Sequence, residues 1–216
     1  MFRNFLENLL SIILPKSRRI LEIEGATENE LVEKIPRAEI TSNENFKALF
    51  QYKNELARLA IWEIKYKNNR KIAEKFSRLL YEFILEEISD EMAFFNFKNP
   101  LLLPVPAGKM SLRKRGFNQC ELLAEEIIKL DQDKTFELSL DALKKIKETE
   151  NQVRTKSRKE RLGNLSDSFW VDSEKVHGRN VILVDDVITT GATLEEISKT
   201  LKRAGAKKVI GFSIAH

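Results

Sequence analysis

The sequence Val181-Ile-Leu-Val-Asp-Asp-Val-Ile-Thr-Thr-Gly-Ala-Thr193 decides the fold class. Its four leading apolar residues are typical of a strand that is buried on both faces. Apolar residues then repeat at helical spacing from Leu194 to Leu201, and Gly205 ends that helix. Val209 to Ile214 follows as a further strand. Because strand, helix and strand alternate, we predict an α/β fold with a parallel sheet that helices cover on both faces.

The same stretch combines two carboxylates with a loop rich in hydroxyl groups. The loop opens a helix, whose first N–H groups and partial positive charge suit a phosphate monoester. Asp185 and Asp186 suit a vicinal diol, since each carboxylate accepts a hydroxyl proton, and they could also orient the hydration shell of Mg²⁺. A site that takes a phosphate next to a vicinal diol fits a ribose 5-phosphate. The predicted phosphate-binding residues are Thr189, Thr190, Gly191, Ala192 and Thr193.

This stretch resembles the phosphoribosyl pyrophosphate signature of type I phosphoribosyltransferases. A resemblance to the competence protein F (ComF) family lies in Leu-Pro-Val-Pro at 103–106, in the block Leu112–Gln119, and in Gln152, Arg158, Arg161, Asn164 and Phe169. The likeness covers roughly residues 46–216. It implies the type I phosphoribosyltransferase fold, Mg²⁺ with phosphoribosyl pyrophosphate as ligand, a site centred on Asp185 and Asp186, and a link to DNA uptake in natural competence.

Two basic segments have both a plain and a functional interpretation. Lys109–Gln119 follows the predicted strand Leu101–Val105 and is either a solvated loop and helix start or part of a pyrophosphate site, as the resemblance implies. The polar segment Lys147–Gly163 is either a solvated loop or a lid that keeps water from an oxocarbenium-like ribosyl centre. The predicted pyrophosphate and lid residues are Lys109, Arg113, Arg115, Gln152, Arg158 and Arg161.

We predict that residues 1–44 form an appendage and that residues 45–216 form the phosphoribosyltransferase-like domain. The appendage would contain an amphipathic helix over Phe2–Leu14 and an acidic linker from residue 22 with at most one short helix. The Phe2–Leu14 stretch is far short of the ~20 apolar residues of a membrane span, so we expect a cytoplasmic protein. Helical spacing predicts two lead-in helices, from Phe46 to Ile64 and, after a turn at Asn68-Asn69, from Ile72 to Ile84.

The composition limits the possible metal sites. The 216 residues include one Cys and two His, which excludes a disulfide framework and a tetrathiolate zinc site. Members of the ComF family commonly begin with a Cys-rich zinc module, and the residues before Phe46 contain no Cys. We therefore expect Mg²⁺ and no zinc. Cys120 is expected to pack against the sheet.

Charge and composition leave two functions open. The formal net charge of +4 lies entirely beyond residue 90, as expected for solvated helix faces or for the surroundings of an anionic ligand. The first function is an enzyme in which a nucleophile, expected to be a nitrogen, displaces pyrophosphate from the anomeric carbon, mainly through positioning and charge stabilisation. The second is a non-catalytic component of DNA uptake that binds a nucleotide ligand and contacts single-stranded DNA or a helicase partner. The sequence shows no basic stripe interleaved with aromatic residues of the kind that stacks bases.

Overall fold

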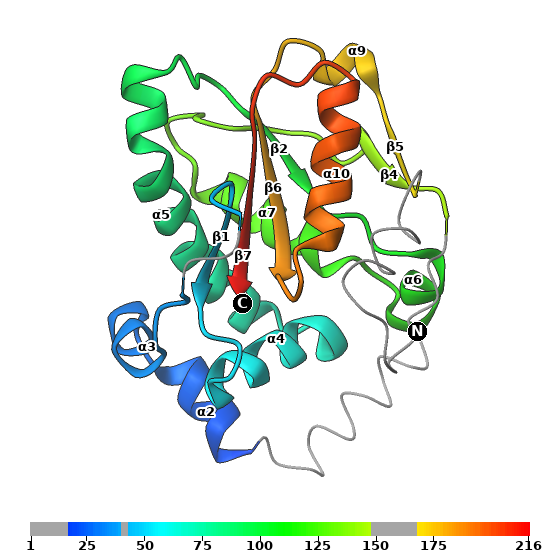
Figure 1. Cartoon of the computed structure of the whole chain (residues 1–216). Coiled ribbons are helices and arrows are strands. Elements are labelled where there is room, and N and C mark those ends of the chain that lie inside the picture. The colour runs from blue at the N-terminus through cyan, green and yellow to red at the C-terminus, as the bar shows by residue number, and fades with distance from the viewer. Residues whose placement is uncertain (1–16, 40–42, 148–167) are drawn as a thin grey trace.

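A five-stranded parallel sheet organises the chain in the computed structural model (Figure 1), which describes residues 17–39, 43–147 and 168–216. Its strands are β1 (Phe46–Phe50), β2 (Leu101–Pro104), β3 (Glu137–Leu138), β6 (Val181–Val187) and β7 (Val209–Ala215). They lie in the order β1-β7-β6-β2-β3, and every neighbouring pair is parallel. All five strands therefore end at the same edge of the sheet, which lies at the bottom of Figure 1.

Helices cover both faces of this sheet, as the sequence predicts. They are α2 (Arg18–Gly25), α3 (Glu28–Lys34), α4 (Glu55–Lys67), α5 (Arg70–Phe94), α6 (Lys109–Arg115), α7 (Gln119–Leu130), α9 (Ser173–Val176) and α10 (Ala192–Arg203). Ile182 and Val184 of β6 belong to the core cluster under α4, α5 and α7, whereas Val181 and Leu183 belong to the cluster under α10. A separate antiparallel pair, β4 (Leu143–Lys145) and β5 (Phe169–Val171), lies beside α10.

The strands and helices around the signature stretch confirm their predictions. The strands predicted at 101–105, 181–184 and 209–214 correspond to β2, β6 and β7, and the helix predicted from Leu194 to Leu201 is α10. The turn at Asn68-Asn69 is also confirmed. Asn68 ends α4 in the left-handed conformation, and the side chain of Asn69 caps α5 by accepting the N–H of Ile72 at 3.3 Å.

The first lead-in helix begins nine residues later than predicted, because residues 46–50 form strand β1. β1 pairs in parallel with β7, with Phe46 opposite Gly211 and Phe50 opposite Ala215. The strand is buried on both faces, and a short apolar run of this kind fits a strand or a buried helix equally well. Pairing with the edge of β7 selects the strand over the helix, and this edge exists only once the sheet has formed.

From residue 22 the acidic segment contains the end of α2 and the whole of α3, so the one short helix that the prediction allowed is present, whereas the linker is wrong. Ile23 of α2, Leu31 of α3 and Ile35 are fully buried in the same core cluster as α4 and α5. Thr27 and Glu30 begin α3 with a reciprocal capping box. The charged residues of this segment therefore form the outer faces of packed helices. The division of the chain at residue 44 stays a prediction, and the helix predicted over 2–14 lies outside the described residues.

The basic segment after β2 is also helical where a loop was predicted. Lys109–Arg115 forms α6 between Gly108 and Gly116, and Gly116 ends the helix with a φ of 84°. Each residue between these two glycines is a fair or good helix former, which explains the helix. Within the described residues, no helix is both long and apolar enough to cross a membrane.

Candidate functional site

The two carboxylates of the signature stretch lie at the carboxyl edge of the sheet. Strand β2 ends at Pro104, opposite Val184, so Asp185 and Asp186 on β6 extend past its last residue. Asp185 is half-buried and Asp186 is buried. The backbone N–H of Asp186 donates to Oδ1 of Asp185 at 2.8 Å, which fixes the Asp185 side chain against the backbone. Two adjacent acids in so little solvent need compensation from neighbouring groups.

Lys65 supplies that compensation from α4. Its Nζ lies 2.7 Å from Oδ2 of Asp186. Burial lowers the pKa of Lys65, but the charge of Asp186 and its hydrogen bond outweigh burial, so the pKa lies above its usual value. The ammonium therefore stays charged and ties α4 to the end of β6.

Cys120, at the start of α7, contacts the other acid. Its Sγ donates to Oδ1 of Asp185 at 3.4 Å. Burial, followed by the charges of Asp185 and Asp186, raises the pKa of the Cys120 thiol well above its usual value, so the thiol stays protonated. Burial and then the charge of Asp186 raise the pKa of Asp185 to about 7. The prediction that Cys120 packs against the sheet is confirmed by its burial, whereas its hydrogen bond to Asp185 was missed.

The loop after β6 leads into an open helix end. Gly191 precedes α10 with a φ of 74°, a conformation that favours glycine, and no side chain caps the helix. Thr190 Oγ1 lies 3.5 Å from the backbone nitrogen of Ala192, a distance at which a hydrogen bond is weak. Thr189 is exposed and Thr193 is half-buried. The first-turn N–H groups of α10 and these hydroxyls therefore form a donor set of the kind that takes a phosphate.

The structure describes half of the predicted pyrophosphate and lid residues. Lys109 and Arg113 are exposed on α6. Arg115 donates from Nη1 to Oε1 of Gln119, and its guanidinium lies 5.6 Å from the centroid of the Tyr66 ring. Arg115 therefore joins α6 to α4, near Lys65. Gln152, Arg158 and Arg161 lie outside the described residues, and so does most of the predicted lid.

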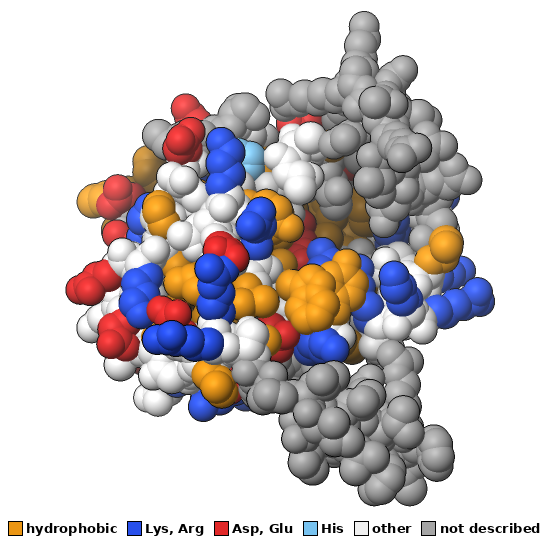
Figure 2. Space-filling model, turned by 90° about the horizontal axis from the view of Figure 1, so that it is seen from below, with side chains coloured by type: hydrophobic (Ala, Val, Ile, Leu, Met, Phe, Trp, Pro, Cys, Tyr) orange, Lys and Arg blue, Asp and Glu red, His pale blue; other side chains and the backbone are white. Residues whose placement is uncertain are grey.

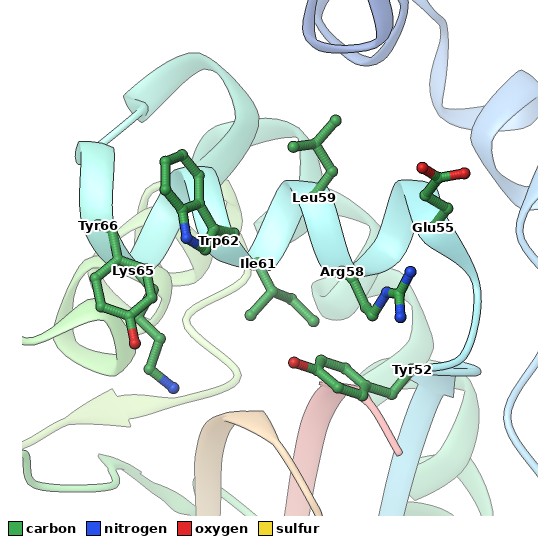
Figure 3. A pocket seen from close by; sticks show the side chains of 8 residues that line it. All are labelled: Tyr52, Glu55, Arg58, Leu59, Ile61, Trp62, Lys65 and Tyr66. Atoms are coloured by element: carbon green, nitrogen blue, oxygen red, sulfur yellow. The ribbon is translucent and has the colours of Figure 1, made fainter.

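A groove of about 420 Å³ runs along α4 at this edge of the molecule (Figure 3). Tyr52 approaches it from the residues after β1, and the Lys65 side chain points down from α4 toward the strands. The sequence analysis assigned no chemistry to α4, so it missed this groove and Lys65. One signal was available: Lys65 adjoins the buried residues Ile61 and Ile64, and a charge at the margin of an apolar stripe often has a buried partner. The full lining is Tyr52, Glu55, Arg58, Leu59, Ile61, Trp62, Lys65 and Tyr66.

Among the described residues, Cys120, Asp185 and Asp186 form a cluster whose potential ligand atoms lie within 4.8 Å of one another. Carboxylate oxygens suit Mg²⁺, whereas a thiol does not, and the Lys65 ammonium repels a cation bound directly to Asp186. The donor set fits a hydrated Mg²⁺ whose water molecules the carboxylates orient. It fits direct ligation poorly.

The family model and the similar proteins agree on the family of this chain. The model of the phosphoribosyl transferase domain matches residues 65–215. The chain is 34% identical over 161 residues to Competence protein F of Haemophilus influenzae, covering 73% of this chain and 66% of that protein. It is 33% identical over 153 residues to Competence protein ComFC of Streptococcus pneumoniae, with coverages of 68% and 64%. It is 32% identical over 152 residues to the DNA utilization protein YhgH of Escherichia coli O157:H7, with coverages of 70% and 63%. The chain thus spans just under two thirds of the length of these relatives.

Proposed function

Since this chain belongs to the phosphoribosyl transferase domain family, and within it to the ComF family, we propose that it binds phosphoribosyl pyrophosphate or a related ribose 5-phosphate ligand. We further propose that it transfers the phosphoribosyl group to an acceptor and releases pyrophosphate. The observation that carries this proposal is the pairing of two carboxylates at the end of β6 with the uncapped start of α10, five residues further on. A ribose 5-phosphate carries a diol and a phosphate close together, so its site needs acceptors for the diol next to donors for the phosphate.

Each part of the site has a distinct task in this proposal. Asp185 and Asp186 accept the hydroxyl protons of the ribose, and charge-assisted hydrogen bonds of this kind are about twice as strong as neutral ones. The loop Thr189–Thr193 and the first N–H groups of α10 hold the 5-phosphate. Lys65 forms an ion pair with Asp186 and fixes its side chain in position. Catalysis then comes from holding the sugar in one orientation and from stabilising the charges of the departing pyrophosphate.

Magnesium belongs to this proposal as part of the ligand. When bound, Mg²⁺ neutralises the pyrophosphate oxygens and makes pyrophosphate a better leaving group. Asp185 is the side chain placed to orient its water shell, because Lys65 already engages Asp186. The ionised carboxylate of Asp185 orients these water molecules better than the neutral acid, because it accepts their hydrogen bonds with both oxygens.

The test of ligand binding uses the paired substitution Asp185→Asn and Asp186→Asn, which keeps side-chain volume and removes both charges. Charge-assisted hydrogen bonds contribute about 1.5–3 kcal/mol each, so calorimetry should show at least a tenfold loss of affinity for Mg²⁺–phosphoribosyl pyrophosphate. Asp133→Asn with Asp141→Asn is the matched control, since both of these acids are exposed. Unchanged affinity in a folded Asp185→Asn, Asp186→Asn protein would refute the assignment.

Transfer itself is tested by a screen of nucleobases and amines for pyrophosphate release. Release that depends on one acceptor and disappears in the Asp185→Asn, Asp186→Asn variant supports the enzyme. Tight ligand binding without release by any acceptor favours the non-catalytic alternative.

We propose as the second candidate a role in DNA uptake, with single-stranded DNA or a helicase as partner. The observation that favours it is the set of relatives named as competence and DNA utilization proteins. This role does not require transfer, because the ligand site could serve regulation or phosphate binding alone. The two candidates therefore make separate predictions, and one protein could satisfy both.

A further inference from the structure

Three exposed aromatic side chains gather along α4 and the residues before it. Tyr52, Trp62 and Tyr66 are 40%, 45% and 48% exposed, although rings of this size are usually more deeply buried. All three line the groove of Figure 3. The rings of Trp62 and Tyr66 lie 5.9 Å apart between centroids, tilted by 46°, so they do not cover each other fully. The groove therefore offers aromatic surface to a ligand.

Basic side chains accompany these rings. Nζ of Lys67 lies 5.5 Å from the centroid of the Trp62 ring, and Arg115 lies 5.6 Å from that of Tyr66. Arg58 lines the groove beside Tyr52. Figure 2 shows this face from below, with hydrophobic and basic side chains side by side at the edge where the strands end. The sequence shows no continuous stripe of this kind, because Tyr52, Trp62 and Arg115 come from separate segments that the fold brings together.

The acids near the groove are compensated by other residues. Glu55 is the acidic residue of the lining, and it forms an ion pair with Arg19. Asp186 forms an ion pair with Lys65. In the described part of the chain, no acidic side chain forms an ion pair with Arg58 or Lys67. The surface is therefore positive at its rim and aromatic at its centre.

We propose that the groove along α4 binds a single-stranded nucleic acid, with bases stacked on Tyr52, Trp62 and Tyr66 and phosphates paired with Arg58, Lys67 and Arg115. Stacking on aromatic rings accepts any base, and cations along the rim follow the backbone. A duplex hides its base faces, so rings of this kind add nothing to duplex binding. The proposal rests on the second proposed function, the role in DNA uptake, and does not require phosphoribosyl transfer.

Tryptophan fluorescence tests the stacking directly. The chain has two Trp, and Trp170→Phe leaves Trp62 as the single tryptophan. Titration of this variant with oligothymidylate should quench the fluorescence in a saturable way, and the affinity should fall with salt by a log–log slope of about −0.7 per neutralised phosphate. Binding of the strand without quenching of Trp62 would overturn the proposal, as would no binding at low salt.

Substitutions then measure what the rings contribute. Stacking contributes about 1–3 kcal/mol per base, so Trp62→Ala should lower the affinity for oligothymidylate about fivefold or more, and Trp62→Ala with Tyr66→Ala more than tenfold. Trp170→Ala is the matched control, because Trp170 is also exposed and has a lysine, Lys144, 5.2 Å from its ring centroid. Equal losses in the Trp62 and Trp170 variants would overturn the proposal.

Two further measurements separate this inference from the ligand site. Trp62→Ala should keep the melting temperature and the affinity for Mg²⁺–phosphoribosyl pyrophosphate, so that loss of strand binding is not loss of fold. Saturation of the groove by a single thymidine nucleotide with the affinity of the oligonucleotide would overturn strand binding, because it would identify a subsite for one base. Equal affinity for duplex and single strand would also overturn it.

Discussion

At the scale of residues, the signature stretch predicts the two acids of the site but not the group that compensates them. Asp185 and Asp186 follow from a buried strand that leads directly into a helix start. Lys65 lies 121 positions before Asp186 in the sequence. The predicted start of its helix, α4, was wrong, so the apolar pattern did not indicate toward which element the Lys65 side chain points. The side chain of Lys65 is 25% exposed and that of Asp186 only 6%, so solvent screens this pair less than a surface pair. Its strength can be measured.

We expect Lys65→Met to lower the free energy of unfolding by about 2–4 kcal/mol, because it leaves the carboxylate of Asp186 buried without its counter-charge. Adding Asp186→Asn should recover most of this loss, since the remaining amide carries no charge to desolvate. Urea denaturation of the two single variants and the double variant completes the cycle. Lys67→Met is the control, because Lys67 is exposed on the same helix. Strictly additive losses would mean that the pair contributes no coupling.

At the scale of elements, periodicity predicts long regular elements well and short ones poorly. The strands β6 and β7 and the helix α10 follow from their patterns, because each is long enough to show its repeat. β1 has five residues, and the choice between strand and helix depends on the edge of β7. α2 and α3 are short and acidic, and one buried face of two or three apolar residues does not stand out from a solvated linker. Tertiary contacts therefore determine the conformation of β1, α2 and α3.

Leu31 tests whether α3 belongs to the core. The side chain is fully buried, so Leu31→Ala should lower the free energy of unfolding by about 2–5 kcal/mol through lost burial and the cavity left behind. Leu21→Ala on α2 is the matched control, since Leu21 is 55% exposed and should cost only a few tenths of a kcal/mol. Chemical denaturation of both variants gives the comparison. Similar small effects would restore the interpretation of this segment as a linker.

At the scale of the whole molecule, one edge of the sheet gathers everything to which a function is assigned here. The acids of β6, the start of α10 and the groove under α4 all lie where the parallel strands end, the usual place for ligands in open α/β sheets. The sequence alone predicts the acids and the helix start as one ligand site, because both lie in the continuous stretch Val181–Thr193. The aromatic groove did not follow in the same way, because Tyr52, Trp62 and Arg115 come from three separate elements that only the complete fold brings together.

The metal content of the purified protein is the prediction for the whole chain. A structural zinc site needs four ligands, usually thiolates and imidazoles, and this chain offers Cys120, His177 and His216 in total. In the described residues, the cluster of potential metal ligands at Cys120 contains carboxylates and no imidazole. We therefore expect elemental analysis to find no stoichiometric zinc, and a chelator to leave the melting temperature unchanged.

Phosphoribosyl pyrophosphate, in contrast to a chelator, should change the melting temperature. At a concentration about 100 times its dissociation constant, a ligand adds about 2.7 kcal/mol of stability, which raises the melting temperature of a chain of this size by roughly 5–10 °C. We expect this rise with Mg²⁺ and a much smaller rise without it, because the carboxylates of Asp185 and Asp186 repel a bare pyrophosphate whose charge no metal offsets. Thermal denaturation with and without Mg²⁺, repeated in the Asp185→Asn, Asp186→Asn variant, measures both effects. An equal rise in the absence of Mg²⁺ would show that the acids bind the ribose without a metal beside them, whereas one tightly held zinc per chain would place a structural site among residues to which no metal is assigned here.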